Sequence, residues 1–110
     1  RILTLINQET TMTKHIVFFK FKAEVSENVR TSAFKAFKDG IERLPSEIPY
    51  IREAFVGRNC NEAEKWDVCL HSVFDNLEDV KAYSVHPSHK AVASEFMKFV
   101  AERACVDFEI

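Results

Sequence analysis

The chain has 110 residues, the length of a single domain that can bury its own core. Apolar residues make up 46% of it, ten residues are Phe, and the formal net charge is -2. Because the lysines and arginines are scattered and no apolar run approaches a membrane span, we expect neither nucleic-acid binding nor membrane insertion. The three cysteines lack the CxxC spacing of a zinc site, so the pattern favours a reduced, cytoplasmic protein with no metal and no cofactor.

The stretch RILTLINQETT precedes Met12, and its apolar part is too short for a signal peptide with a cleavage site. We expect residues 1–11 to be an N-terminal extension, with a short extra strand or a disordered arm as the alternatives. The domain is then predicted to cover residues 12–110.

Residues 14–22, KHIVFFKFK, predict a strand because β-branched and aromatic residues dominate them. One face of this strand carries, in chain order, His15, Val17, Phe19 and Phe21. The opposite face holds Ile16 and Phe18 between lysines. Because both faces are apolar at the centre, the strand should be buried on both sides.

The rest of the chain continues with helices and strands separated by clear stop signals. Ser26 can cap a helix whose apolar stripe runs to Leu44, where Pro45 ends it. The further predicted elements are strands at 51–57 and 66–74, a short helix at 77–83, a helix from Pro87 through Val100, and a strand at 104–110. This order is typical of the split βαβ, ferredoxin-like α+β fold, a four-stranded antiparallel sheet with helices on one face.

Helices cover one face of such a sheet, yet the first strand is apolar on both. We therefore expect the face that carries Val17, Phe19 and Phe21 to be covered by a second copy of the sheet. This predicts a homodimer formed through the sheet face, with an apolar interior between the two sheets.

The segment AYSVHPSH, residues 82–89, concentrates polar chemistry in a chain that has only four histidines and two tyrosines. A helix that begins at Pro87 would hold His89 in its first turn, where the partial positive charge favours a neutral imidazole. Tyr83 could donate to a developing oxyanion, and His15 would complete a minimal acid–base site. The alternative is a helix boundary beside a core tyrosine. His86 and His89 are three residues apart, but Pro87 between them argues against a metal pair.

Several segments together resemble the stress-responsive A/B barrel domain (Dabb) family over roughly residues 13–109. They are KHIVFFKFK, VGRN, WDVCLHSVFDN, AYSVHPSH and VDFE, and the Tyr-x-x-His-Pro-x-His piece is the most specific. The resemblance implies a ferredoxin-like subunit that dimerises through its sheets into an α+β barrel. One member of this family closes a linear polyketide by aldol condensation. Its catalytic pair falls on Tyr83 and His89, and its two other cavity histidines fall on His15 and Val68.

These observations favour a dimer with an apolar cavity that binds a small apolar or aromatic carbonyl compound. Acid–base catalysis, of the enolisation or cyclase type, would use Tyr83 and His89. The residues predicted to contact the ligand are His15, Val17, Phe19, Val68 and His86. Whether the protein is an enzyme stays open, because a non-catalytic stress-linked structural dimer and a cofactor-free monooxygenase-like or haem-degrading enzyme use the same fold.

Overall fold

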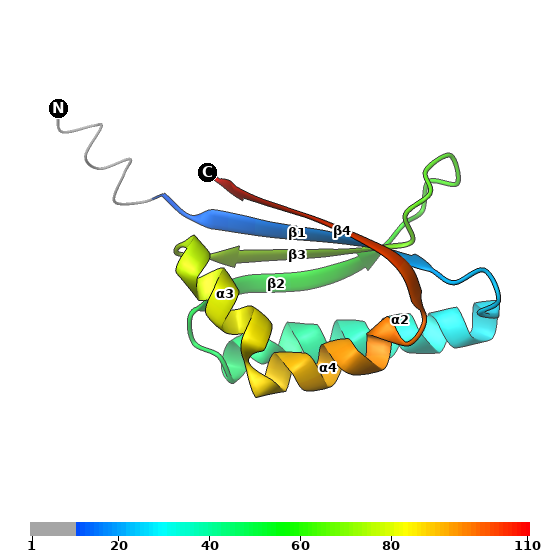
Figure 1. Cartoon of the computed structure of the whole chain (residues 1–110), viewed down its shortest axis with the longest axis horizontal. Helices are drawn as coiled ribbons and strands as arrows, with labels where there is room; N and C mark the ends of the chain where they lie inside the picture. The colour runs from blue at the N-terminus through cyan, green and yellow to red at the C-terminus, as the bar shows by residue number, and fades with distance from the viewer. Residues whose placement is uncertain (1–10) are drawn as a thin grey trace, which may run out of the picture.

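The computed structural model describes residues 11–110 (Figure 1). Apart from Thr11, the predicted N-terminal extension lies outside the described residues. The elements are, in chain order, β1 (Thr13–Phe21), α2 (Glu27–Arg43), η1 (Leu44–Ser46), β2 (Ile51–Arg58), β3 (Val68–Phe74), α3 (Leu77–Val85), α4 (Pro87–Met97) and β4 (Val100–Glu109).

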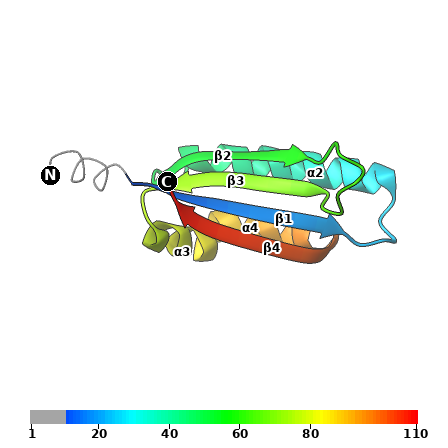
Figure 2. The same cartoon turned by 90° about the horizontal axis from the view of Figure 1, so that it is seen from above.

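The strands form one antiparallel sheet in the order β2-β3-β1-β4, with β1 and β3 at its centre. Figure 1 shows α2 and α4 along one face of the sheet, and Figure 2 shows the other face without a covering helix. The predicted ferredoxin-like α+β fold is therefore confirmed. Among the described helices, none is both long and apolar enough to cross a membrane.

Each helix begins where the sequence supplies a cap. The Ser26 side chain accepts a hydrogen bond from the backbone N–H of Val29, and Asn76 does the same for Asp79. Helix α4 starts with Pro87 in its first turn, where a missing N–H leaves no donor unpaired. His86 and Pro87 mark the point at which α3 ends and α4 begins, and so they position the AYSVHPSH segment.

The predicted extension of the last helix through Val100 is wrong. Helix α4 ends at Met97, and Val100 is the first residue of β4, opposite Phe21 of β1. The backbone N–H of Lys22 donates to the carbonyl of Phe99 at 2.9 Å, which holds the turn between helix and strand. Val100 fits the helical spacing because its side chain still points into the same core.

The prediction that Val17, Phe19 and Phe21 face a second sheet is also wrong. Their side chains are almost completely buried against the helices of the same chain. The Phe19 ring makes edge-to-face contacts with Phe37 of α2 and Phe96 of α4, at centroid distances of 5.3 and 5.2 Å. Alternation along a strand identifies two faces, but it does not show which of two apolar faces the helices cover.

The open face of the sheet carries the other set of apolar side chains. Ile16 and Phe18 are half-buried there, and the strand register places Val106 opposite Ile16. Phe55, Val106 and Phe108 are exposed to 48%, 55% and 44%. Exposed apolar side chains gathered on an uncovered face of a sheet are a usual mark of an interface.

Candidate functional site

A cavity of about 150 Å³ lies between the sheet and the helices of the same chain. It is therefore not the space between two sheets that the sequence pattern predicted. Its walls come from three strands and all three α-helices. The residues that line it are His15, Val17, Phe19, Phe37, Leu70, Tyr83, Ser84, His89, Ala93, Met97 and Arg103.

Tyr83 and His89 face each other in this wall. Tyr83 lies near the end of α3, and His89 lies in the first turn of α4. The break at His86 and Pro87 folds the two helices so that the rings are 4.2 Å apart between centroids, at an angle of 46°. The predicted pairing of these two side chains is thus present in the structure.

Both side chains have a buried polar atom without a hydrogen-bond partner among the described residues. These atoms are the hydroxyl oxygen of Tyr83 and Nδ1 of His89. The Tyr83 side chain is only 1% exposed, so its hydroxyl cannot turn to bulk water. Buried polar groups in native proteins are nearly always paired, and exceptions gather at functional sites. The unpaired hydroxyl and imidazole are the strongest indication of a binding site in this cavity.

The surroundings keep both groups neutral at neutral pH. Burial lowers the pKa of His89 below its usual value, and Coulomb interactions with His15, Arg103 and His86 act in the same direction. A hydrogen bond between the ring and the Ser84 backbone opposes this shift without overcoming it. Burial raises the pKa of the Tyr83 hydroxyl above its usual range, although the charge of Arg103 opposes that shift. His89 is therefore a free base, and Tyr83 keeps its proton as a donor.

The sequence predicted that the partial positive charge at the start of a helix would keep His89 neutral. In the structure, the largest cause of its lowered pKa is burial.

His15 connects the cavity to a polar cluster on the neighbouring edge strand. Its side chain is 8% exposed, and its Nδ1 lies 2.6 Å from a carboxylate oxygen of Asp107. The Sγ atom of Cys105 is 3.6 Å from the same nitrogen. The His15 ring also approaches Tyr83 edge-on, with 6.1 Å between centroids. The His15 ring thus lies between the cavity and the two β4 side chains.

Five of the seven predicted site residues line this cavity, and two do not. His15, Val17, Phe19, Tyr83 and His89 are brought together as described above.

Val68 and His86 do not line the cavity, so their assignment to the ligand-contacting wall is not supported. Val68 is buried in the core at the other end of β3, beside a separate hollow near Trp66. His86 is the N-cap of α4, where its ring accepts a hydrogen bond from the backbone N–H of Ser88. A histidine that caps a helix end is held at the helix terminus and does not turn into the cavity.

Sequence reasoning missed Arg103, Cys105 and Asp107, which come from β4. The strand register pairs His15 with Asp107 and Val17 with Cys105, so these side chains share the helix-covered side of the sheet. Residues 104–110 were predicted as a strand, but its pairing partner and register were not. Knowing that β4 lies antiparallel beside β1 would have been enough to find them.

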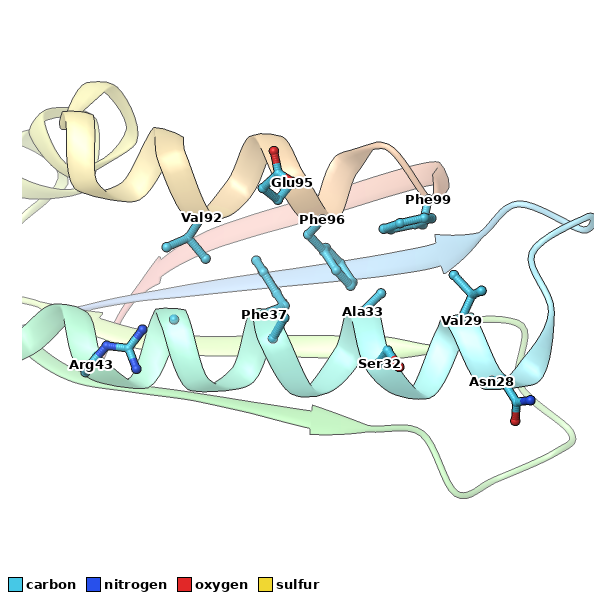
Figure 3. Close-up of a pocket in the computed structure, with 12 residues that line it drawn as sticks. Asn28, Val29, Ser32, Ala33, Phe37, Arg43, Val92, Glu95, Phe96 and Phe99 are labelled. Carbon is cyan, nitrogen blue, oxygen red and sulfur yellow. The ribbon is translucent and has the colours of Figure 1, made fainter.

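The larger hollows contain no comparable pair of groups. One of about 530 Å³ lies between α2 and α4, where Phe37 and Phe96 point toward each other (Figure 3). Their rings are stacked at a centroid distance of 4.0 Å. Its walls are mainly apolar, with Arg43 and Glu95 among the charged residues. This hollow is a groove between packed helices, and it offers no base beside a protonated donor.

Comparison with known proteins agrees with this description. Residues 13–110 match the family described as the Stress Responsive A/B Barrel Domain. Olivetolic acid cyclase from Cannabis sativa is 24% identical over 98 residues, which cover 86% of this chain and 93% of that protein.

Two solved structures show the same fold. A dimeric ferredoxin-like protein of unknown function from Bacteroides fragilis is 43% identical, with a TM-score of 0.87 over 90% of this chain and 96% of that one. Hydroxynitrile lyase from Passiflora edulis is 18% identical, with a TM-score of 0.73 over 90% of this chain and 93% of that one. The family match covers nearly the whole described structure, and the chain belongs to the stress-responsive A/B barrel domain family.

Proposed function

We propose that the protein is a homodimeric acid–base enzyme that removes a proton from a small carbonyl compound. The observation that carries this proposal is the pair of buried, unpaired polar atoms on Tyr83 and His89 that face one cavity. A neutral imidazole is a base, and a phenol with a raised pKa is a hydrogen-bond donor, so the two groups have complementary roles.

In the proposed step, His89 takes a proton from the carbon next to the substrate carbonyl. The C–H electron pair forms a carbon–carbon double bond, and the carbonyl electrons move to the oxygen, which becomes an enolate. The Tyr83 hydroxyl donates a hydrogen bond to that oxygen, and the positive charge of Arg103 favours the negative intermediate. The protonated His89 then returns the proton to the same carbon, which restores the carbonyl group and the neutral imidazole.

The imidazole tautomer fits this role. Nδ1 of His89 has no hydrogen-bond partner among the described residues, and we propose that the neutral ring carries its proton on Nε2. A neutral ring that donates through Nε2 leaves the lone pair of Nδ1 free to accept a proton.

The size of the cavity limits the substrate. A cavity of about 150 Å³ is below the roughly 300 Å³ at which sites for drug-sized ligands begin. An engineered apolar cavity of about this volume binds benzene. Val17 and Phe19 make part of the wall apolar, so we expect a compact carbonyl compound with a short alkyl or aromatic group.

The relatives support an enzyme on this scaffold. The names olivetolic acid cyclase and hydroxynitrile lyase both denote enzymes, and each is similar to this chain over most of its length. We do not extend cyclisation of a long polyketide to this chain. The family resemblance assigns a further cavity histidine to Val68, which is an apolar residue buried away from the cavity.

We further propose that two copies associate through the open face of the sheet. The exposed apolar side chains Phe55, Val106 and Phe108 support this, since burying them together would remove a large apolar patch from water. Solved relatives that share the fold are described as dimeric.

The three cysteines are free thiols, which fits the predicted cytoplasmic location.

The proposal can be tested without knowing the natural substrate. Protein is incubated in D₂O with acetone or acetophenone, and the exchange of protons next to the carbonyl is followed by proton NMR. The wild-type protein should accelerate exchange, His89→Gln should lower the rate by about 10²–10⁴-fold, and Tyr83→Phe should lower it by about 10²–10³-fold.

His71→Gln is the matched control, because His71 lies on the open face of the sheet, where its ring is tilted against that of Phe55 with 4.5 Å between centroids. Its exchange rate should equal that of the wild type. No acceleration by the wild-type protein, or equal rates for His89→Gln and wild type, would refute the proposed activity.

A further inference from the structure

His15 in the cavity wall meets two further potential metal ligands of different chemistry, Cys105 and Asp107 of β4. Nδ1 of His15, Sγ of Cys105 and a carboxylate oxygen of Asp107 all lie within 4.8 Å of one another. Spacing along the chain does not predict this cluster, since His15 is 90 residues from Cys105.

The distances between the three ligand atoms are close to those of a tetrahedral zinc site. With Zn–S near 2.3 Å and Zn–N near 2.0–2.1 Å, tetrahedral angles place sulfur and nitrogen about 3.5 Å apart. The Sγ–Nδ1 distance is 3.6 Å. Cys105 Sγ lies 3.8 Å from the second carboxylate oxygen of Asp107, slightly longer than the corresponding edge. The remaining edge, from His15 to Asp107, is 2.6 Å because the two are hydrogen-bonded, and it must open when an ion enters.

We propose that His15, Cys105 and Asp107 form a binding site for Zn²⁺ or a similar late first-row divalent ion. Thiolate and imidazole ligands favour this class of ion over Mg²⁺ or Ca²⁺, which prefer oxygen ligands alone. A thiolate and a carboxylate together neutralise the two positive charges of the ion. Three protein ligands leave the fourth tetrahedral position open to water or a small ligand.

The sheet holds the three ligands in place. His15 is paired with Asp107, and Val17 with Cys105, so the ligands project from neighbouring positions on two hydrogen-bonded strands. Ligands on paired strands need little rearrangement before the metal binds. The side chain of Asp107 is 31% exposed and that of His15 is 8% exposed, which gives the ion a route from solvent to a mostly buried nitrogen.

The experiment uses Co²⁺, a spectroscopic substitute for Zn²⁺, added to full-length protein from which metals have been removed with a chelator. Binding of one ion per chain should produce the near-ultraviolet absorption of a cobalt–thiolate bond, and Zn²⁺ should displace the Co²⁺. Excess Mg²⁺ should leave the absorption unchanged.

Cys105→Ser should abolish the thiolate absorption. Loss of a residue that only hydrogen-bonds to a metal ligand lowers metal affinity by roughly 10–100-fold. Asp107→Asn removes a proposed ligand itself, so it should lower the affinity for Co²⁺ by more than that.

Cys69→Ser and Cys60→Ser are the matched controls, because both thiols are free and neither belongs to the cluster. Both should bind Co²⁺ as the wild type does. Full thiolate absorption in Cys105→Ser, or no stoichiometric binding by the wild type, would overturn the proposal. Because the readout is metal binding, the result does not depend on whether the cavity is catalytic.

Discussion

Replacing Tyr83 by phenylalanine should make the protein more stable and less active at the same time. The hydroxyl is buried, since Tyr83 is 1% exposed, and it has no partner among the described residues. A buried hydroxyl left unpaired costs about 1–3 kcal/mol, which the substitution recovers. The void that it leaves is smaller than a methyl group and costs less than about 1 kcal/mol. The free energy of unfolding should therefore rise by about 1 kcal/mol, or about 4 °C in melting temperature.

The assay is urea unfolding followed by circular dichroism, with Tyr50→Phe as the matched control. Tyr50 is half-buried and its hydroxyl is not among the buried unpaired atoms, so its replacement should not raise stability. A loss of more than about 1 kcal/mol in Tyr83→Phe would mean that the hydroxyl makes a favourable hydrogen bond in the free protein. The assignment of Tyr83 as an unpaired donor held ready for a ligand would then be wrong.

Further predictions concern pH, packing and assembly. Burial lowers the pKa of His89 below its usual value of 6.5, so the exchange activity should persist as the pH falls through 6.5. It should decline only when the pH approaches the lowered pKa of His89, which a pH–rate profile measures. His89 has a lower pKa in the folded protein than in the unfolded chain, so the unfolded chain binds a proton at higher pH. The free energy of unfolding should therefore fall as the pH drops below 6.5. Denaturant titrations should show a weaker dependence of this free energy on pH in His89→Gln. A Cβ at Gly40 would lie 2.8 Å from a methyl group of Val92. Gly40→Ala should therefore destabilise the wild-type protein. In the Val92→Ala background the clash is absent, so the higher helix propensity of Ala should make Gly40→Ala stabilising by up to about 1 kcal/mol. A double-mutant cycle measures this difference. Phe55→Asp and Val106→Asp should give folded monomers by light scattering; a monomeric wild type, or variants that remain dimeric, would contradict an interface on the open face.

The sequence was sufficient for the fold because each element carries its own local signal. Ser26 caps α2 where it was expected to, and Pro87 begins α4. The AYSVHPSH segment was also sufficient to pair Tyr83 with His89, since a proline break between two short helices forces their ends together.

What could not be predicted depends on non-local geometry. Two apolar faces on β1 look alike in sequence, and only the packing of Phe19 against Phe37 and Phe96 shows which one is inside. For the same reason the cavity was placed between two subunits when it lies within one. Asp107 and Cys105 reach His15 through the register of β4 against β1, which no spacing along the chain reveals.

The central claim is that Tyr83 and His89 bind and activate a carbonyl group inside the subunit. A crystal structure of the protein with acetophenone tests it most directly. We expect the carbonyl oxygen within hydrogen-bond distance of the Tyr83 hydroxyl and the methyl carbon facing Nδ1 of His89. Acetophenone bound between two sheets or in the groove between α2 and α4, with the Tyr83 cavity unchanged, would contradict the account.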